Sequence, residues 1–476
     1  MTSKITGNTL RDKPAVRWTV LVMIALTMLF AYMFVDVLSP LKTQLNQVMG
    51  WDGTVFGTYA GSEFFINVFL LFLIFAGIIL DKMGVRFTAI LSGSLMVLGA
   101  GIKVYALSPA FNNGAFPYHL LENWFPGFPP SAALACCGFA IFGMGTEMGG
   151  VTVSRAIVKW FSGYEMAMAM GIEMAVARLG VFAVFQTSPR INQAIVEKLG
   201  VSSGLEAIQT VQAPVLFVFI LLCIGLLLYL IYGVLDKKLE QQSSALDVEE
   251  EDPFRFKDLG KVFGSSAFWL VALLCVLYYS AIFPFQKYAT NMLESNLGLS
   301  TTKASSIFSL FPIGAMIITP FLGLFLDRKG KGASMLIVGS ILMIVCHGTF
   351  ALYPFDNSTS SFIVAIIAIV LLGISFSLVP AALWPSVPKL IDNKVLGSAY
   401  SSIFYVQNIG LMVVPMVIGS VLDKTNPGIP AGDPLNYTPA MLIFTSFGVV
   451  ALLLSLYLKA VDKRRHYGLE EPNIKK

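Results

Sequence analysis

Long apolar runs recur along the chain and predict helices that cross a membrane. Such a helix needs about 20 predominantly apolar residues, and twelve runs reach that length. The expected spans are 18–38, 54–80, 86–107, 131–158, 166–187, 213–235, 266–289, 303–326, 333–353, 361–385, 397–422 and 439–460. The pattern therefore predicts an all-α membrane protein with twelve transmembrane helices.

The longest polar connection lies between the sixth and seventh spans and divides the chain into two six-helix halves. It contains the acidic run from Asp247 to Asp252, which is typical of a solvated linker. The expected parts are an N-terminal tail (1–17), an N-terminal half (18–235), a linker (236–265), a C-terminal half (266–460) and a C-terminal tail (461–476). The loop 108–130, rich in proline and aromatic residues, is expected to form a packed cap or an interfacial aromatic belt.

The basic residues fall mostly on one side of the expected membrane. With loops alternating sides and the N-terminus inside, 23 of the 32 lysines and arginines lie on inside segments. Cytoplasmic loops carry such an excess. The distribution therefore predicts that both termini are cytoplasmic.

Composition agrees with a membrane protein and narrows its chemistry. Hydrophobic residues make up 56% of the chain and charged residues only 13%, against about 25% charged residues in soluble domains. The run from Trp18 is long enough to span and should remain as a membrane helix. The three histidines are scattered and no metal-ligand spacing, nucleophile–base pair or nucleotide-binding loop is evident. We therefore expect no metal, cofactor, nucleic-acid partner or enzymatic activity.

Four charged residues lie within expected spans between positions 143 and 180: Glu147, Arg155, Glu173 and Arg178. A charge at membrane depth costs about 2.5–3.5 kcal/mol on insertion scales. Such residues indicate a polar cavity or substrate path, and the alternative is a structural ion-pair network. Arg155 lies about 12 Å along the helix from Glu147 and is expected to pair with Glu165 across the following turn, while Glu173 has no role that the sequence supports.

The two halves repeat each other. Glycine, aspartate and basic residues recur in the loops after the second and eighth spans, around Asp81 and Asp327, at an offset of 246 residues. Parallel repeats of this kind are a transporter architecture, with the site near the midplane between the halves.

Spans 4 and 10, and spans 5 and 11, align at an offset of 230 residues. Glu147 then corresponds to Ser377, and Arg178 corresponds to Asn408. The mapping predicts a cavity with charges on the N-terminal side and neutral groups on the other. Glu147 and Arg178 are expected to bind substrate or to form a mutual ion pair.

Further polar and aromatic residues in the spans are weaker candidates. Asp36 and Glu63 are candidate proton-coupling or outer-gate groups, with a structural role as the alternative. Tyr278 precedes Pro284, which should interrupt its helix, and broken helices are common beside transporter sites. Trp384 is expected either to line the cavity or to anchor the helix at the membrane interface.

The paired loops resemble the signature of the major facilitator superfamily. The resemblance implies a cytoplasmic gate that involves Asp81, Arg86 and Asp327. Shorter pieces of spans 4, 5, 7, 10 and 11 are together similar to the branch of lysosomal dipeptide transporters and their bacterial relatives: Gly145-Thr-Glu147, Trp160-Phe161-Ser-Gly163-Tyr-Glu165, Ala177-Arg178-Leu-Gly180, Phe283-Pro284-Phe285, Ala382-Leu-Trp384-Pro385 and Gln407-Asn408-Ile-Gly410. This resemblance implies a dipeptide uniporter with Glu147 and Arg178 in its binding site.

Three hypotheses follow. The first is a transporter of dipeptides or similar small zwitterions by alternating access, either uniport or proton-linked. The second is a proton-coupled symporter or exchanger of a small organic anion, with Arg178 binding the anion and Asp36, Glu63 or Glu147 carrying the proton. The third is a non-transporting membrane receptor or scaffold. For the leading hypothesis we expect a monomer in the lipid bilayer of a bacterial inner membrane, with protons as a candidate coupling ion.

Overall fold

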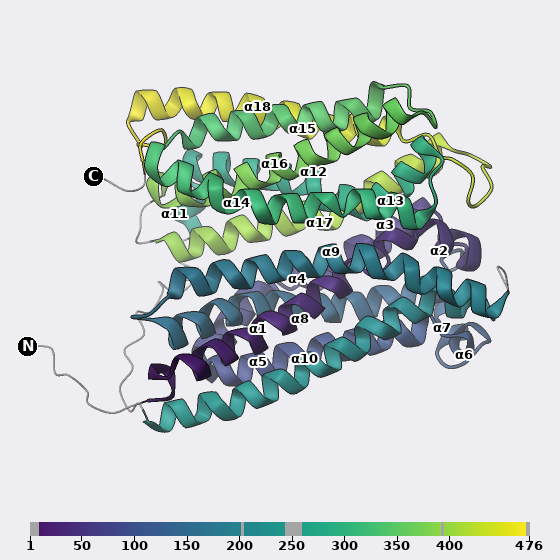
Figure 1. Ribbon diagram of the computed structural model, residues 1–476, viewed down its shortest axis with the longest axis horizontal. Helices are drawn as coiled ribbons and strands as arrows, with labels where there is room; N and C mark the ends of the chain where they lie inside the picture. Colours follow the sequence, from purple (N-terminus) through teal and green to yellow (C-terminus); the bar gives the residue numbers. More distant parts are fainter. Residues whose placement is uncertain (1–8, 201–203, 243–258, 392–394, 473–476) are drawn as a thin grey trace, which may run out of the picture.

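The computed structural model describes residues 9–200, 204–242, 259–391 and 395–472, and these fold into helices joined by loops (Figure 1). The elements are η1 (Leu10–Asp12), α1 (Pro14–Val35), η2 (Ser39–Leu41), α2 (Lys42–Met49), α3 (Gly53–Ser62), α4 (Phe65–Phe69), α5 (Phe72–Ala106), α6 (Pro109–Asn112), α7 (Tyr118–Trp124), α8 (Pro130–Phe161), α9 (Met166–Leu199), α10 (Ile208–Gln242), α11 (Leu259–Phe263), α12 (Ser266–Leu297), α13 (Thr301–Phe308), α14 (Leu310–Lys329), α15 (Gly332–Leu352), α16 (Thr359–Leu390), α17 (Leu396–Thr425) and α18 (Thr438–Arg465). The all-α class is confirmed. The acidic run expected in the linker lies outside the described residues.

The helices form two bundles that lie side by side (Figure 1). One bundle, the N-half, contains the helices up to α10, and the other, the C-half, contains α12 to α18. We call the end of the bundles where α1 begins at Pro14 and α18 ends at Arg465 the terminal face. The opposite end, which contains α2 and the start of α3, is the far face.

The second expected span is broken, and this changes the count of long apolar helices. Eleven helices of the described chain are long and apolar enough to cross a membrane, whereas the sequence predicts twelve. The path expected over 54–80 is divided between α3, α4 and the start of α5, with Leu71 in a left-handed conformation (φ 51°). Gly84 (φ 78°) then turns the chain inside α5, so the second and third crossings are continuous in one element. The twelve-crossing, two-half architecture is consistent with this path.

The loop between the third and fourth crossings is a packed cap, as expected. It contains the short helices α6 and α7, and a small apolar cluster of Phe111, Leu121 and Ala133 joins them to the start of α8. The aromatic residues of this loop therefore cover one corner of the N-half at the far face.

Glycines bring the two bundles into close contact near the far face. Gly53, Gly57 and Gly61 recur every fourth residue on α3, so they share one side of that helix. A Cβ atom added at any of them would lie closer than 3.0 Å to a backbone carbonyl oxygen of α17. Small residues permit such close approach of membrane helices. In Figure 1 the same region, where α2 and α3 meet α13 and α17, joins the bundles.

Candidate functional site

The Glu147 side chain of the N-half contacts the C-half. It lies near the middle of α8, and its carboxyl group lies against the side chain of Asn408 on α17. The Glu147 side chain keeps part of its solvent-accessible surface at this depth. The Oδ1 atom of Asn408 is buried and has no hydrogen-bond partner among the described residues. Together these groups offer acceptors to a hydrogen-bond donor such as an ammonium group.

Arg178 faces aromatic rings of the C-half. Its guanidinium carbon lies 4.5 Å from the ring centre of Phe376 on α16 and 5.9 Å from that of Phe283 on α12. Cation–π contacts of this kind stabilise a cation by about 0.5–2 kcal/mol. Among the described residues no carboxylate oxygen lies within 4.0 Å of the guanidinium nitrogens of Arg178. The guanidinium is therefore not neutralised by a direct ion pair with Glu147, and its planar donors can bind a carboxylate.

Tyr32 on α1 lies near both of these charges. It lies within electrostatic range of Arg178, Glu147 and Glu173. Glu173 also lies within electrostatic range of Arg178, although the two do not form an ion pair. The N-half therefore gathers both signs of charge around one tyrosine, which we did not include among the expected site residues.

Aromatic side chains of the C-half form a wall opposite these charges. The indole N–H of Trp384 donates to the Tyr279 hydroxyl at 3.2 Å, and the Trp384 ring lies 5.0 Å from that of Phe404. Tyr279 stacks on Phe283 at 5.5 Å. Trp384, Tyr279, Phe283 and Phe404 all keep part of their surface exposed. Of these four aromatic residues, only Trp384 was among the expected site residues.

Two expected substrate-binding residues point elsewhere. The Tyr278 hydroxyl donates to the carbonyl oxygen of Leu336 at 2.7 Å, and the side chain is fully buried. The Ser377 hydroxyl donates to its own helix at Gly373 O (2.9 Å) and is also buried. Both side chains are therefore used in packing within the C-half in this structure.

A buried ion pair joins the halves near the far face. Asp36 accepts from Lys287 (3.1 Å) and Gln286 (2.5 Å) of α12, and from Ser39 (2.9 Å). Asp36 is 1% exposed. Glu63 is also buried and lies within electrostatic range of Lys287 and Asp36. Asp36 and Glu63 were among the expected residues, whereas Lys287 was not.

Further contacts between the halves lie at the same end. Thr43 donates to Glu294, Lys42 donates to Asn291 at 3.2 Å, and the Asp423 carboxylate accepts from the backbone of Gly53 at 2.8 Å. Apart from the contact of Glu147 with Asn408, the described hydrogen bonds between the halves lie towards the far face, including those of α9 with α13. The bundles are therefore fastened at the far face in this structure.

At the terminal face the expected pair of Arg155 and Glu165 does not form. Arg155 pairs with Asp81 at 3.1 Å, and Glu165 pairs with Arg17 at 2.8 Å. Glu165 lies outside the long helices; a hydrogen bond to its own backbone and another from Arg17 lower its pKa, so it is charged at neutral pH. Arg155 instead reaches α5, which lies beside α8, and the expected pairing was wrong.

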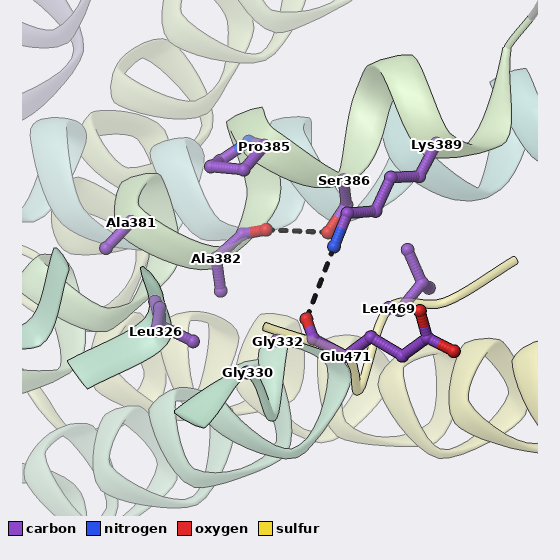
Figure 2. Close-up of a pocket in the computed structure, with 10 residues that line it drawn as sticks. All are labelled: Leu326, Gly330, Gly332, Ala381, Ala382, Pro385, Ser386, Lys389, Leu469 and Glu471. Atoms are coloured by element: carbon purple, nitrogen blue, oxygen red, sulfur yellow. Dashed lines mark hydrogen bonds between the residues drawn. The ribbon is translucent and has the colours of Figure 1, made fainter. Parts of the chain in front are cut away.

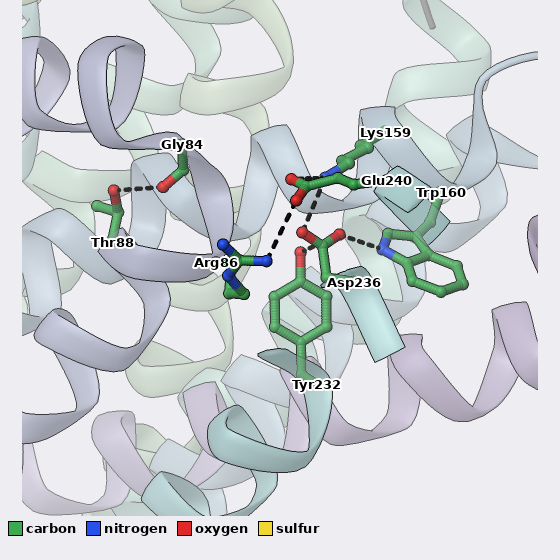
Figure 3. A network of polar contacts seen from close by, with 8 residues as sticks. All are labelled: Gly84, Arg86, Thr88, Lys159, Trp160, Tyr232, Asp236 and Glu240. Atoms are coloured by element: carbon green, nitrogen blue, oxygen red, sulfur yellow. Dashed lines mark hydrogen bonds and ion pairs between the residues drawn. The ribbon is translucent and has the colours of Figure 1, made fainter. Parts of the chain in front are cut away.

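The gate candidate Arg86 belongs to a polar network within the N-half (Figure 3). It pairs with Glu240 at 3.2 Å, and Lys159 bridges Glu240 (2.9 Å) and Asp236 (2.8 Å). Asp236 is fully buried and also accepts from the Trp160 indole at 3.1 Å. The network ties α5, α8 and α10 together at the terminal face.

The remaining expected features are placed as follows. Asp327 lies in the last turn of α14, at the terminal face. No group of three or more histidine, cysteine, aspartate or glutamate side chains that could hold a metal ion occurs among the described residues.

Two helical bundles with charges at their interface define a multi-pass membrane protein of the transporter type. The chain belongs to the Major Facilitator Superfamily, whose family model matches residues 24–415 and again 286–473. It is 28% identical over 396 residues to the human lysosomal dipeptide transporter MFSD1, covering 83% of this chain and 77% of the relative. The zebrafish protein of the same name is 27% identical over 394 residues, covering 83% and 78%. A crystal structure of a variant of the nucleoside transporter NupG superposes with a TM-score of 0.66 at 14% identity, covering 92% of this chain and 99% of the other.

Proposed function

We propose that this transporter moves a small zwitterionic solute, dipeptides above all, by alternating access. One observation carries the proposal: Glu147 and Arg178 lie at the interface of the halves without a direct ion pair between them. A zwitterion offers an ammonium group to Glu147 and the free Asn408 Oδ1, and a carboxylate to Arg178. The names of the animal relatives support the dipeptide as the substrate.

The neutral wall gives the substrate's side chains a place to bind. Trp384, Tyr279 and Phe404 offer apolar ring surface and few hydrogen-bonding groups. Such a surface accepts many side chains because apolar burial is not directional. Recognition in this proposal rests on the charged ends of the solute, and variable side chains face the C-half.

Alternating access requires that the contacts that close the far face can break. In this structure the far face is held by Asp36, Lys287 and the α3–α17 contact. We infer that these contacts break when the site opens to the far face, and that the interface near the terminal face then closes through the segments around Asp81 and Asp327. Uniport needs no other group, while proton-linked transport would use the buried acids Asp36 and Glu63.

The distribution of basic residues supports one orientation. We propose that the terminal face is cytoplasmic, because the excess of lysine and arginine lies there. The proposed location is a bacterial inner membrane, and the proposed functional unit is a monomer.

A second candidate is proton-coupled transport of a small organic anion. It is favoured by the burial of Asp36 and Glu63 beside Lys287, which gathers titratable groups at the interface of the halves. In this case Arg178 binds the anion and one of the acids carries the proton. It differs from the first candidate because Glu147 is then not needed to bind an ammonium group.

Counterflow in proteoliposomes tests the proposal. Wild-type protein should exchange a radiolabelled dipeptide, Glu147→Gln should lose most of the exchange, and Glu122→Gln in the far-face loop should retain it. Full dipeptide exchange by Glu147→Gln would contradict the zwitterion site. Exchange of carboxylates alone would favour the anion transporter, and the absence of flux for any solute would favour a receptor or scaffold.

A further inference from the structure

The segment that follows α18 folds back onto the terminal face of the C-half. After α18, residues Gly468 to Pro472 pass the turn between α14 and α15 (Figure 2). A small pocket lies where this segment meets the end of α16, lined by Pro385, Ser386 and Lys389 from that helix and by Leu469 and Glu471 from the segment. Figure 2 shows Lys389 reaching from α16 to the backbone of Glu471. We call residues 468–471 the C-terminal strap.

The strap supplies the missing cap of α15. The N-cap residue Lys331 has no capping side-chain hydrogen bond, and the first amides of any helix lack partners within the helix. Here the amide of Gly332 donates to Leu469 O at 2.9 Å, and the amide of Ser334 donates to the Glu470 carboxylate at 2.7 Å. A carboxylate at a helix N-terminus also interacts favourably with the helix dipole.

Further bonds fix the strap to three helices. The Ser334 hydroxyl donates to Glu470 at 2.8 Å, and Lys389 of α16 donates to Gly468 O at 3.0 Å. The amide of Leu469 donates to Asp462 of α18 at 3.1 Å, and the Leu469 side chain is 2% exposed. These contacts join the strap to α15, α16 and α18, so the strap connects all three helices at the terminal face.

The close approach of the strap explains two glycines in the α14–α15 turn. A Cβ atom at Gly330 or Gly332 would lie closer than 3.0 Å to backbone atoms of the strap. At the repeat offset of 246 residues, Gly330 corresponds to Gly84 of the first loop, whereas Gly332 corresponds to Arg86. In the structure the absence of a side chain at Gly330 and Gly332 lets the backbone of the strap pack directly against the turn.

In the N-half, ion pairs between charged side chains stabilise the helix ends at the terminal face. There Asp81 pairs with Arg155, next to the network around Asp236. At the repeat offset of 230 residues the C-half has Pro385 in place of Arg155, and Pro385 lines the pocket against which the strap lies. The residue that corresponds to Arg155 in the repeat therefore lies beside the strap.

We propose that the C-terminal strap is an intramolecular clamp that makes the terminal end of the C-half one rigid body. Its docking site is the N-terminus of α15 together with Lys389, and its key group is the Glu470 carboxylate. The mechanical part rests on the proposed transport function, because rocking of the halves requires each half to move as a unit. Docking itself is independent of any transport activity.

Hydrogen–deuterium exchange of the full-length protein tests the docking. In Glu470→Ala, the amides around Gly332 and Ser334 should exchange about tenfold faster or more, as expected for a lost charge-assisted hydrogen bond. Gly332→Ala, whose added Cβ would lie 2.8 Å from Leu469 O, should do the same. Gly348→Ala lies on the same helix, where the nearest atom is 4.0 Å away, and should leave the exchange unchanged. Equal exchange in wild type and Glu470→Ala would overturn the clamp.

Counterflow measurements test the mechanical part. The expected result for Glu470→Ala is a loss of maximal rate with an unchanged KM, because the strap lies far from Glu147 and Arg178. Faster amide exchange with a wild-type transport rate would overturn the rigid-body role. If the wild-type protein did not transport dipeptides, the proposed function would fail while the exchange data still decided the docking.

Discussion

Alanine at Gly57 should weaken the closure of the far face. An added Cβ would lie closer than 3.0 Å to the carbonyl oxygen of Pro415 and 2.8 Å from the Tyr288 hydroxyl. The carbonyl belongs to the backbone of α17, which cannot withdraw locally, so separating the halves relieves the clash. Overpacking costs about 1–3 kcal/mol, and this energy lowers the ratio of closed to open far face by roughly 5- to 140-fold.

Spin-label distances across the far face measure this shift. Labels at Gln47 and Ala431, which are exposed and lie 3.5 Å apart between side-chain nitrogen and carbonyl oxygen, report the separation of the halves once the five native cysteines are replaced. Gly57→Ala should populate longer distances. Gly77→Ala is the control, because it lies in the same crossing with nothing within 4 Å of the added Cβ. Identical distance distributions in Gly57→Ala and Gly77→Ala would refute the reasoning.

Two other substitutions test the same interface and its support. Lys287→Met leaves Asp36 buried without its cation, which costs about 3–5 kcal/mol in the closed state. The same spin labels should therefore move apart. An unchanged distance would show that the ion pair does not hold the far face closed. Gly143→Ala brings a Cβ against the Glu63 carbonyl oxygen and should destabilise the N-half by about 1–3 kcal/mol, lowering its melting temperature in detergent. Gly150→Ala, on the same helix in open space, is the matched control, and equal melting temperatures would contradict the packing argument.

The sequence predicted the membrane helices well because hydropathy is a strong constraint. Backbone groups in lipid must be bonded within helices, so long apolar runs permit few other structures. The break at Leu71 was not predicted, because its left-handed conformation is unfavourable for a bulky residue and depends on tertiary packing. Gly53, Gly57 and Gly61 recur every fourth residue, which is typical of a helix face in close contact with another helix. This spacing could have predicted that α3 packs closely against another helix.

Charged residues within apolar helices are easy to recognise in a sequence, so the charged part of the candidate site could be predicted. The rotation of each helix, which decides where its side chains point, cannot be read from the sequence in the same way. Tyr278 and Tyr279 differ by one residue, which turns the side chain by about 100°; the sequence favoured the tyrosine that packs inside the C-half. Arg155 was paired with Glu165 because they are near in sequence, but the helix beside α8 supplies Asp81 at 3.1 Å. Contacts between separate helices decide both cases.

Calorimetric binding of a dipeptide and its end-blocked forms tests the zwitterion site most directly. For wild-type protein, amidation of the carboxylate of alanylalanine should weaken binding by roughly 10- to 150-fold, the effect of about 1.5–3 kcal/mol for a charged hydrogen-bonding group. Arg178→Ala should bind the free and the amidated dipeptide equally, and Glu147→Gln should no longer distinguish the free from the N-acetylated dipeptide. If Arg178→Ala still discriminated against the amide as strongly as wild type does, Arg178 would not be the carboxylate-binding group and the account would be contradicted.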